Sequence, residues 1–209
     1  MRNKHTGKHT RMLAIIMKKG NFFRFSAVCS LLSGLFLTIG WTINIRRDSL
    51  AGASLLLIAY VLALFAFMGI YGIQHKRLTI IGFIGFIFVV AANALFVPWV
   101  FLDIARISGV AAQVDWKEVQ DIGPTHVIGV IGGIGFVIGF FLLGVDTIRA
   151  KVFSKWPAIL LIIAGIMPLI YTWLPIGKLL PRIAGLALLG FSWNLWILSK
   201  PKTNTLEVD

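Results

Sequence analysis

Residues 50–73 read LAGASLLLIAYVLALFAFMGIYGI and contain no charged side chain. Wound into an α-helix, a run of this length crosses the hydrocarbon core of a bilayer, which is about 30 Å thick. An element of a water-soluble domain would instead show polar residues at helical spacing or in strict alternation. The stretch therefore predicts a membrane-spanning helix.

The same pattern recurs along the whole chain. Of its 209 residues, 58% are hydrophobic and 13% are charged, whereas soluble domains carry about 25% charged residues. Runs long enough to span a membrane cover residues 25–45, 50–73, 78–102, 126–148, 157–174 and 183–199. We therefore predict an all-α, polytopic bundle of about six transmembrane helices over residues 25–199. A basic tail (1–24), an outer loop (103–125) and a C-terminal tail (200–209) complete the predicted organisation.

The positive charges predict the orientation of this bundle. The net charge is +12, and the 20 lysines and arginines fall almost entirely between the apolar runs. Because cytoplasmic segments carry the excess of these residues, we place both termini in the cytoplasm of a multi-pass cell-membrane protein. Six basic residues then lie outside: Arg46, Arg47, Arg106, Lys117, Lys178 and Arg182. The expected partners of the inner basic segments are anionic lipid headgroups and not nucleic acid.

The outer loop is the one acidic segment of the chain. Asp103, Asp115 and Glu118 lie in it, and Trp116 suits a membrane interface. These four residues are candidates for docking a partner or substrate. The alternative is that the loop merely connects two helices and needs a soluble face.

The fourth run has a glycine face. Gly132, Gly135 and Gly139 fall within about 60° of one another on a helix, and Asp146 continues the same stripe. One hypothesis makes this face the wall of a solute pathway with a cation or proton site at Asp146. The alternative is close helix packing, with Asp146 paired to Arg149 one turn later.

Two asparagines lie within predicted spans, Asn93 in the third and Asn194 in the sixth. Each needs a hydrogen-bond partner in the hydrocarbon, and a neighbouring helix is the expected source. Bonds of this kind hold a bundle together without implying transport. Asn93 lies nearest to the middle of the bilayer and is therefore also a candidate pathway residue.

Catalytic, metal and cofactor chemistry find little support. His75 and His126 fall on opposite sides of the membrane, the other two histidines lie in the basic tail, and Cys29 is the single cysteine. No catalytic residue, metal ligand or cofactor is therefore predicted.

The end of the fourth run, LLGVDTIRAK (142–151) followed by Trp156-Pro157, resembles many small uncharacterised prokaryotic multi-span membrane proteins. The resemblance covers the middle of the chain and implies a multi-span protein without a particular activity.

The favoured hypothesis is a non-enzymatic membrane protein that engages protein or lipid partners, or a second copy of itself, through its helices and outer loop. The alternative is a small-solute transporter or channel that uses the glycine face of the fourth helix. An intramembrane lipid-acting enzyme is a third and weaker hypothesis.

Overall fold

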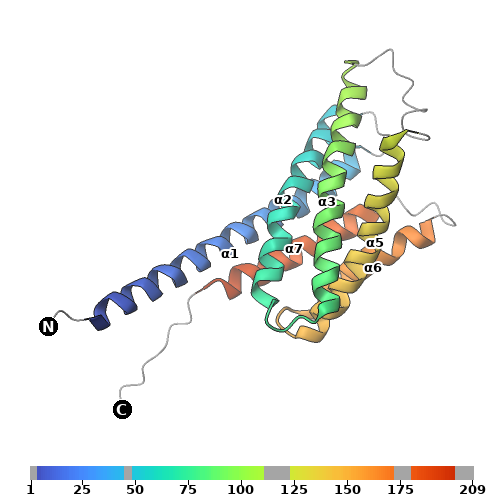
Figure 1. Ribbon diagram of the computed structural model, residues 1–209. Helices are drawn as coiled ribbons and strands as arrows, with labels where there is room; N and C mark the ends of the chain where they lie inside the picture. Colours follow the sequence, from blue (N-terminus) through green and yellow to red (C-terminus); the bar gives the residue numbers. More distant parts are fainter. Residues whose placement is uncertain (1–3, 45–48, 111–122, 172–179, 201–209) are drawn as a thin grey trace.

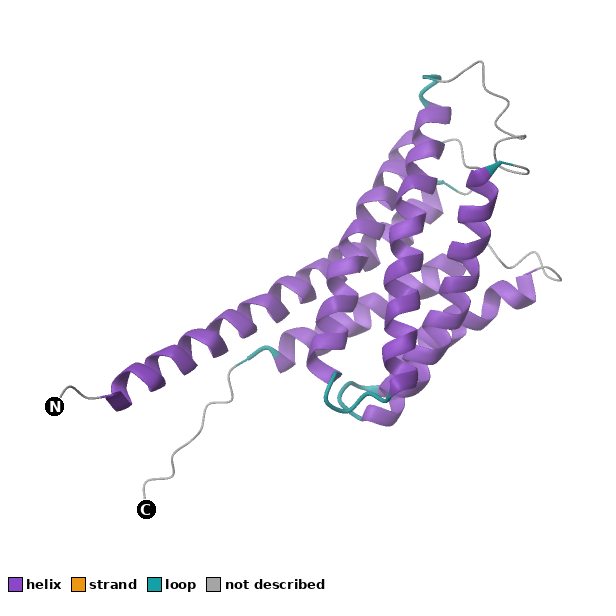
Figure 2. Cartoon of the chain, in the orientation of Figure 1, coloured by secondary structure: helices purple, strands orange, loops and turns teal. Residues whose placement is uncertain are grey.

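The computed structural model describes residues 4–44, 49–110, 123–171 and 180–200, and every regular element in these ranges is an α-helix (Figure 1, Figure 2). The helices are α1 (Lys4–Ile43), α2 (Leu50–Gln74), α3 (Ile80–Ile107), α5 (Pro124–Ala150), α6 (Lys155–Tyr171) and α7 (Leu180–Leu198). The predicted all-α class is confirmed.

Local signals set several of the helix ends. The Ser49 hydroxyl accepts a hydrogen bond from the Gly52 N–H at 3.1 Å and so caps the start of α2. Pro124 occupies the first turn of α5, where its missing N–H costs nothing. Gly109 and Lys151 follow α3 and α5 with φ of 68° and 53°, in the left-handed conformation that ends a helix.

The helices form a closed ring in chain order. Each packs against the next, α7 returns to pack against α1, and α2 also touches α7. The α2–α3 turn, at His75, and the α5–α6 turn lie together at one end of the bundle, which we call the His75 end (Figure 1). The opposite end, where α1 gives way to α2, is called the Trp41 end.

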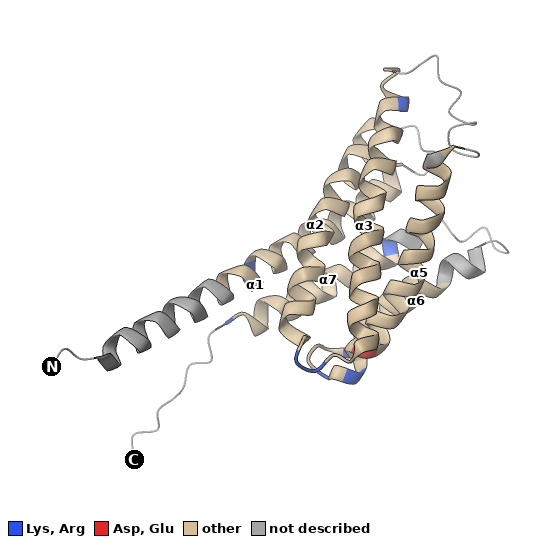
Figure 3. Ribbon diagram, in the orientation of Figure 1, with Lys and Arg blue, Asp and Glu red and all other residues tan. Residues whose placement is uncertain are grey.

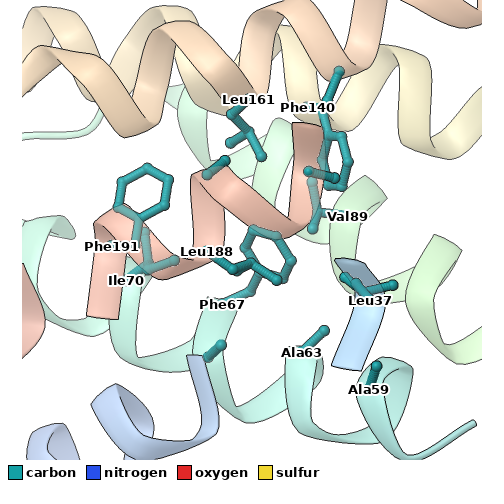
Figure 4. Packing of buried hydrophobic residues seen from close by; sticks show 14 of the residues in the cluster. Leu37, Ala59, Ala63, Phe67, Ile70, Val89, Phe140, Leu161, Leu188 and Phe191 are labelled. Carbon is teal, nitrogen blue, oxygen red and sulfur yellow. The ribbon is translucent and has the colours of Figure 1, made fainter. Parts of the chain in front are cut away.

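The core is densely filled and centres on α2. Small side chains on α2, Ala59 and Ala63 among them, are fully buried and let neighbouring helices approach closely (Figure 4). Larger groups interlock between them, with the rings of Phe67 and Phe140 5.8 Å apart. Leu188 of α7 joins the same cluster, so side chains from distant parts of the chain meet in the middle of the bundle.

The outer surface is apolar. Large hydrophobic side chains such as Ile87 and Phe101 on α3 and Ile131 and Ile134 on α5 are exposed, a distribution that suits lipid as the solvent. Four described helices are long and apolar enough to cross a membrane, with spans of 24, 25, 28 and 26 residues in α1, α2, α3 and α5. Shorter apolar stretches, Lys155–Ile166 and Arg182–Leu198, lie in α6 and α7. The chain is therefore a membrane-embedded helical protein.

Two helix bounds and one interior proline add to the sequence prediction. The backbone of α1 is already helical at Lys4, so the predicted basic tail continues into the first span without a break. Helix α3 runs on to Ile107, which places Asp103 on the helix rather than in the outer loop. Pro98 lies inside α3, a proline within a span that the sequence analysis did not single out.

Candidate functional site

The glycine face of α5 lies against α3. A Cβ built on Gly139 would stand 2.7 Å from the backbone nitrogen of Val89, and one on Gly132 would stand 2.9 Å from Phe96. Gly135 faces Ala92 at 3.2 Å in the same way. Both helices contribute to this approach, because Gly85 of α3 lies equally close to the α5 backbone. The three predicted glycines are therefore brought together, and α3 occupies the space in front of them.

Asp146 binds the start of α3 from the neighbouring helix. Its side chain is 2% exposed, and its two carboxylate oxygens accept hydrogen bonds from the Thr79 N–H at 2.7 Å and the Thr79 hydroxyl at 3.0 Å. Thr79 is the N-cap residue of α3, whose first N–H groups have no partner within the helix. Gly82 leaves room for the carboxylate, since a Cβ there would collide with Asp146 Oδ2.

A second buried pair lies beside this carboxylate. Gln74, the last residue of α2, donates from Nε2 to the hydroxyl of Thr147 at 3.0 Å, and both side chains are buried. Together Asp146, Thr147, Gln74 and Thr79 tie the α2–α3 turn to α5. Lysines and arginines lie at this same end of the bundle (Figure 3). Arg149, the expected partner of Asp146, is exposed, and the one ion pair found within the described residues joins Arg106 to Asp103.

The two asparagines predicted to lie within spans differ in their hydrogen-bond partners. Asn93 is buried and donates to the Val89 carbonyl of its own helix at 2.8 Å. Asn194 reaches beyond α7: its amide oxygen accepts from the Ser154 N–H at 3.0 Å, and its amide nitrogen donates to the Ser154 hydroxyl at 2.9 Å. Asn194 also donates to the Gly190 carbonyl of its own helix, so it differs from Asn93 in the added bonds that hold the α5–α6 turn against α7.

The Trp41 end contains a small, largely enclosed cavity of about 40 Å³ between α1, α2 and α3. Its walls are Trp41, Asn44, Leu56, Tyr60, Phe96, Trp99, Val100 and Asp103. Asp103 is 7% exposed, and its Oδ1 lies 3.5 Å from Arg106 Nη2. Asp115, Trp116 and Glu118, the other predicted docking residues, lie outside the described residues.

Sequence reasoning missed the partners in these contacts. Thr79, Thr147 and Gln74 carry ordinary side chains near helix ends, and only the register of α3 against α5 shows what they bind. Trp41 and Trp99 are typical of a membrane interface by position alone. Nothing in their spacing indicates that they share a cavity with Asp103.

The described residues contain no group of three His, Cys, Asp or Glu side chains arranged to hold a metal ion. Fold and contacts together define a helical membrane protein whose polar groups mostly join one helix to another. Comparison with protein-family models, curated proteins and solved structures finds no match for the chain.

Proposed function

We propose that the chain is a non-enzymatic, six-span membrane protein that acts on protein or lipid partners through its outer surface and its outer loop. The protein lies in the cell membrane with both termini on the cytoplasmic side. Its basic segments on that side contact anionic lipid headgroups. The observation that carries this proposal is the hydrogen bonding of the Asp146 carboxylate. The carboxylate best placed to serve a solute pathway instead holds the N-terminus of α3.

The packing around Asp146 supports the same conclusion. A pathway along the glycine face requires space beside Gly132 and Gly139, and the α3 backbone and Phe96 fill that space. Phe67, Phe140 and Leu188 interlock in the middle of the bundle. These contacts favour a structural role for the glycine face over transport.

Ion flux tests this proposal against the transporter alternative. Purified protein is reconstituted into vesicles that contain a pH-sensitive or a K⁺-sensitive dye, with protein-free vesicles as the control. We expect the two preparations to leak H⁺, Na⁺ and K⁺ at the same rate. Flux above the control that Asp146→Asn abolishes, in a variant that still folds, would contradict the proposal and support transport.

Cysteine labelling tests the proposed topology. Cys29 is buried, so Cys29→Ser gives a background in which one new cysteine is the target of a membrane-impermeant maleimide. In whole cells we expect Lys117→Cys to react, and Lys76→Cys and Lys200→Cys to react only after permeabilisation. Labelling of Lys200→Cys in intact cells would show instead that α6 and α7 do not both cross the membrane.

A further inference from the structure

The cavity at the Trp41 end has the composition of a site for an organic cation. Three helices supply four aromatic side chains around it: Trp41 from α1, Tyr60 from α2, and Phe96 and Trp99 from α3. Tyr60 and Phe96 stack with their ring centroids 5.5 Å apart. Aromatic faces carry partial negative charge, and they attract ammonium groups within about 6 Å of the ring.

A carboxylate completes the wall. Asp103 lines the same cavity and is buried. Its Oδ1 also lies 3.5 Å from Arg106 Nη2, so an entering ammonium group would share the carboxylate with that guanidinium. Aromatic faces together with a buried carboxylate favour a positively charged group over a neutral or negative one.

The indole of Trp41 adds a second requirement. Among the residues that the structure describes, its buried Nε1–H has no hydrogen-bond acceptor. A buried donor without an acceptor is costly, and such groups are normally satisfied by protein, water or ligand. An occupant that carries an oxygen a few bonds from its cationic group would give the Trp41 N–H an acceptor and place its positive charge beside Asp103.

The size of the cavity limits the occupant. A volume of about 40 Å³ is far below the roughly 300–1,000 Å³ of a site for a drug-sized ligand, so only a small group enters. We propose that this cavity binds an ammonium group with a neighbouring oxygen acceptor. Such a group is the headgroup of phosphatidylethanolamine or phosphatidylcholine, or a free amine of the same chemistry. The inference is independent of the proposed partner role.

Two binding measurements on the full-length protein test this inference. In the first, tetramethylammonium chloride and ethanolammonium chloride are titrated into detergent-solubilised protein, with NaCl at equal ionic strength as the control, and tryptophan fluorescence is followed. In the second, native mass spectrometry compares phosphatidylethanolamine, phosphatidylcholine and phosphatidylglycerol on delipidated protein. Lipid binding without a response to the salts identifies the headgroup as the source, and saturation by the salts identifies a free amine.

Three variants make the test specific to the cavity. Asp103→Asn should weaken binding of every ammonium probe by about tenfold, because the carboxylate charge is lost. Trp41→Phe keeps an aromatic ring and removes the N–H, so it should weaken binding of probes that contain oxygen and leave tetramethylammonium unchanged. Trp193→Phe alters an exposed tryptophan on α7 at the His75 end and should bind like the wild type.

Several outcomes would overturn the inference. No saturable binding beyond the NaCl control in either measurement means that the cavity holds water alone. Equal binding of phosphatidylglycerol, which has no ammonium group, removes the cation preference. If Asp103→Asn does not fold, Trp41→Phe decides, because undiminished binding of phosphatidylethanolamine would contradict the proposed acceptor contact.

Discussion

Asp146 is a carboxylate within an apolar span, and its hydrogen bonds in the structure explain why it is there. A carboxylate within an apolar span suggests a functional site, because its burial is costly without partners. Thr79 supplies two hydrogen-bond donors, and the N-terminus of α3 presents partial positive charge to the carboxylate. These contacts account for the burial of Asp146 without a transported ion.

Replacing Asp146 with alanine should lower the free energy of unfolding by about 1–3 kcal/mol, because it leaves the half-buried Thr79 N–H without its acceptor. Unfolding of the detergent-solubilised protein measures the change. Arg149→Gln is the matched control and should have little effect, since Arg149 is exposed. If Thr79→Val and Asp146→Ala prove additive in a double-mutant cycle, the two side chains do not interact.

Lys151 has a backbone conformation that favours glycine. Its φ of 53° lies in the left-handed region, which costs a non-glycine residue about 1 kcal/mol. Lys151→Gly should therefore unfold at a higher temperature than Lys151→Ala, a control that removes the same charge. Equal melting temperatures for the two variants would show that the backbone at this position carries no strain.

The sequence predicts the helix face on which Asp146 lies, but it does not predict the residue that Asp146 binds. Helical spacing places Asp146 in line with Gly132 and Gly139, and that alignment follows from residue positions alone. Thr79 is separated from it by the whole of α3 and most of α5, so only the relative register of the two helices brings them together. The same limit applies to Asn93 and Asn194, which look alike in sequence: both donate to a carbonyl one turn earlier in their own helix, but only Asn194 also binds Ser154 of the α5–α6 turn.

At the scale of helices, the α3–α5 seam depends on glycine. Gly85 and Gly139 let the two backbones approach so closely that any side chain at either position would push the helices apart. Apolar runs predict where such helices begin and end to within a few residues. They do not predict which faces meet, because every face of these helices is apolar and the hydrophobic pattern has no strong direction.

Gly139→Ala should destabilise the protein by about 1–3 kcal/mol, because its Cβ would lie 2.7 Å from the Val89 nitrogen and the helices must move apart. Gly133→Ala is an unusually close control in the same helix, since a Cβ there meets nothing within 4 Å. It should be neutral or stabilising, because alanine favours helix over glycine. Equal effects of the two substitutions in the same unfolding assay would argue against the seam.

At the scale of the whole molecule, ring closure joins the two ends of the chain. The Ser30 hydroxyl of α1 donates to the Leu188 carbonyl of α7 at 2.7 Å, and Ser33 donates to the Ala59 carbonyl of α2 at 2.8 Å. Helix α1 therefore holds both neighbours with buried hydroxyls. The sequence predicts the number and order of helices but contains no signal that the last should return to the first.

Because two seams join the halves of the ring, the chain should tolerate a cut between α3 and α5. Co-expressed fragments 1–110 and 111–209 should assemble in the membrane, and a tag on one should recover the other. Gly139→Leu in the second fragment should reduce this recovery, while Gly133→Ala should not. Recovery of the tagged fragment alone would contradict the two-seam arrangement.

Ring closure also has a consequence for biosynthesis. Five of the six contacts that make up the ring join helices that follow one another among the described residues, and they can form as the helices leave the translocon. The contact between α1 and α7 must wait until α7 has been synthesised, and until then Ser30 has no Leu188 carbonyl to bind. A chain that lacks α7 therefore exposes the Ser30 side chain of its first helix to lipid, where its hydroxyl can bond only to a carbonyl of its own helix. Membrane proteases that recognise exposed polar groups within spans should remove such chains faster than the finished protein.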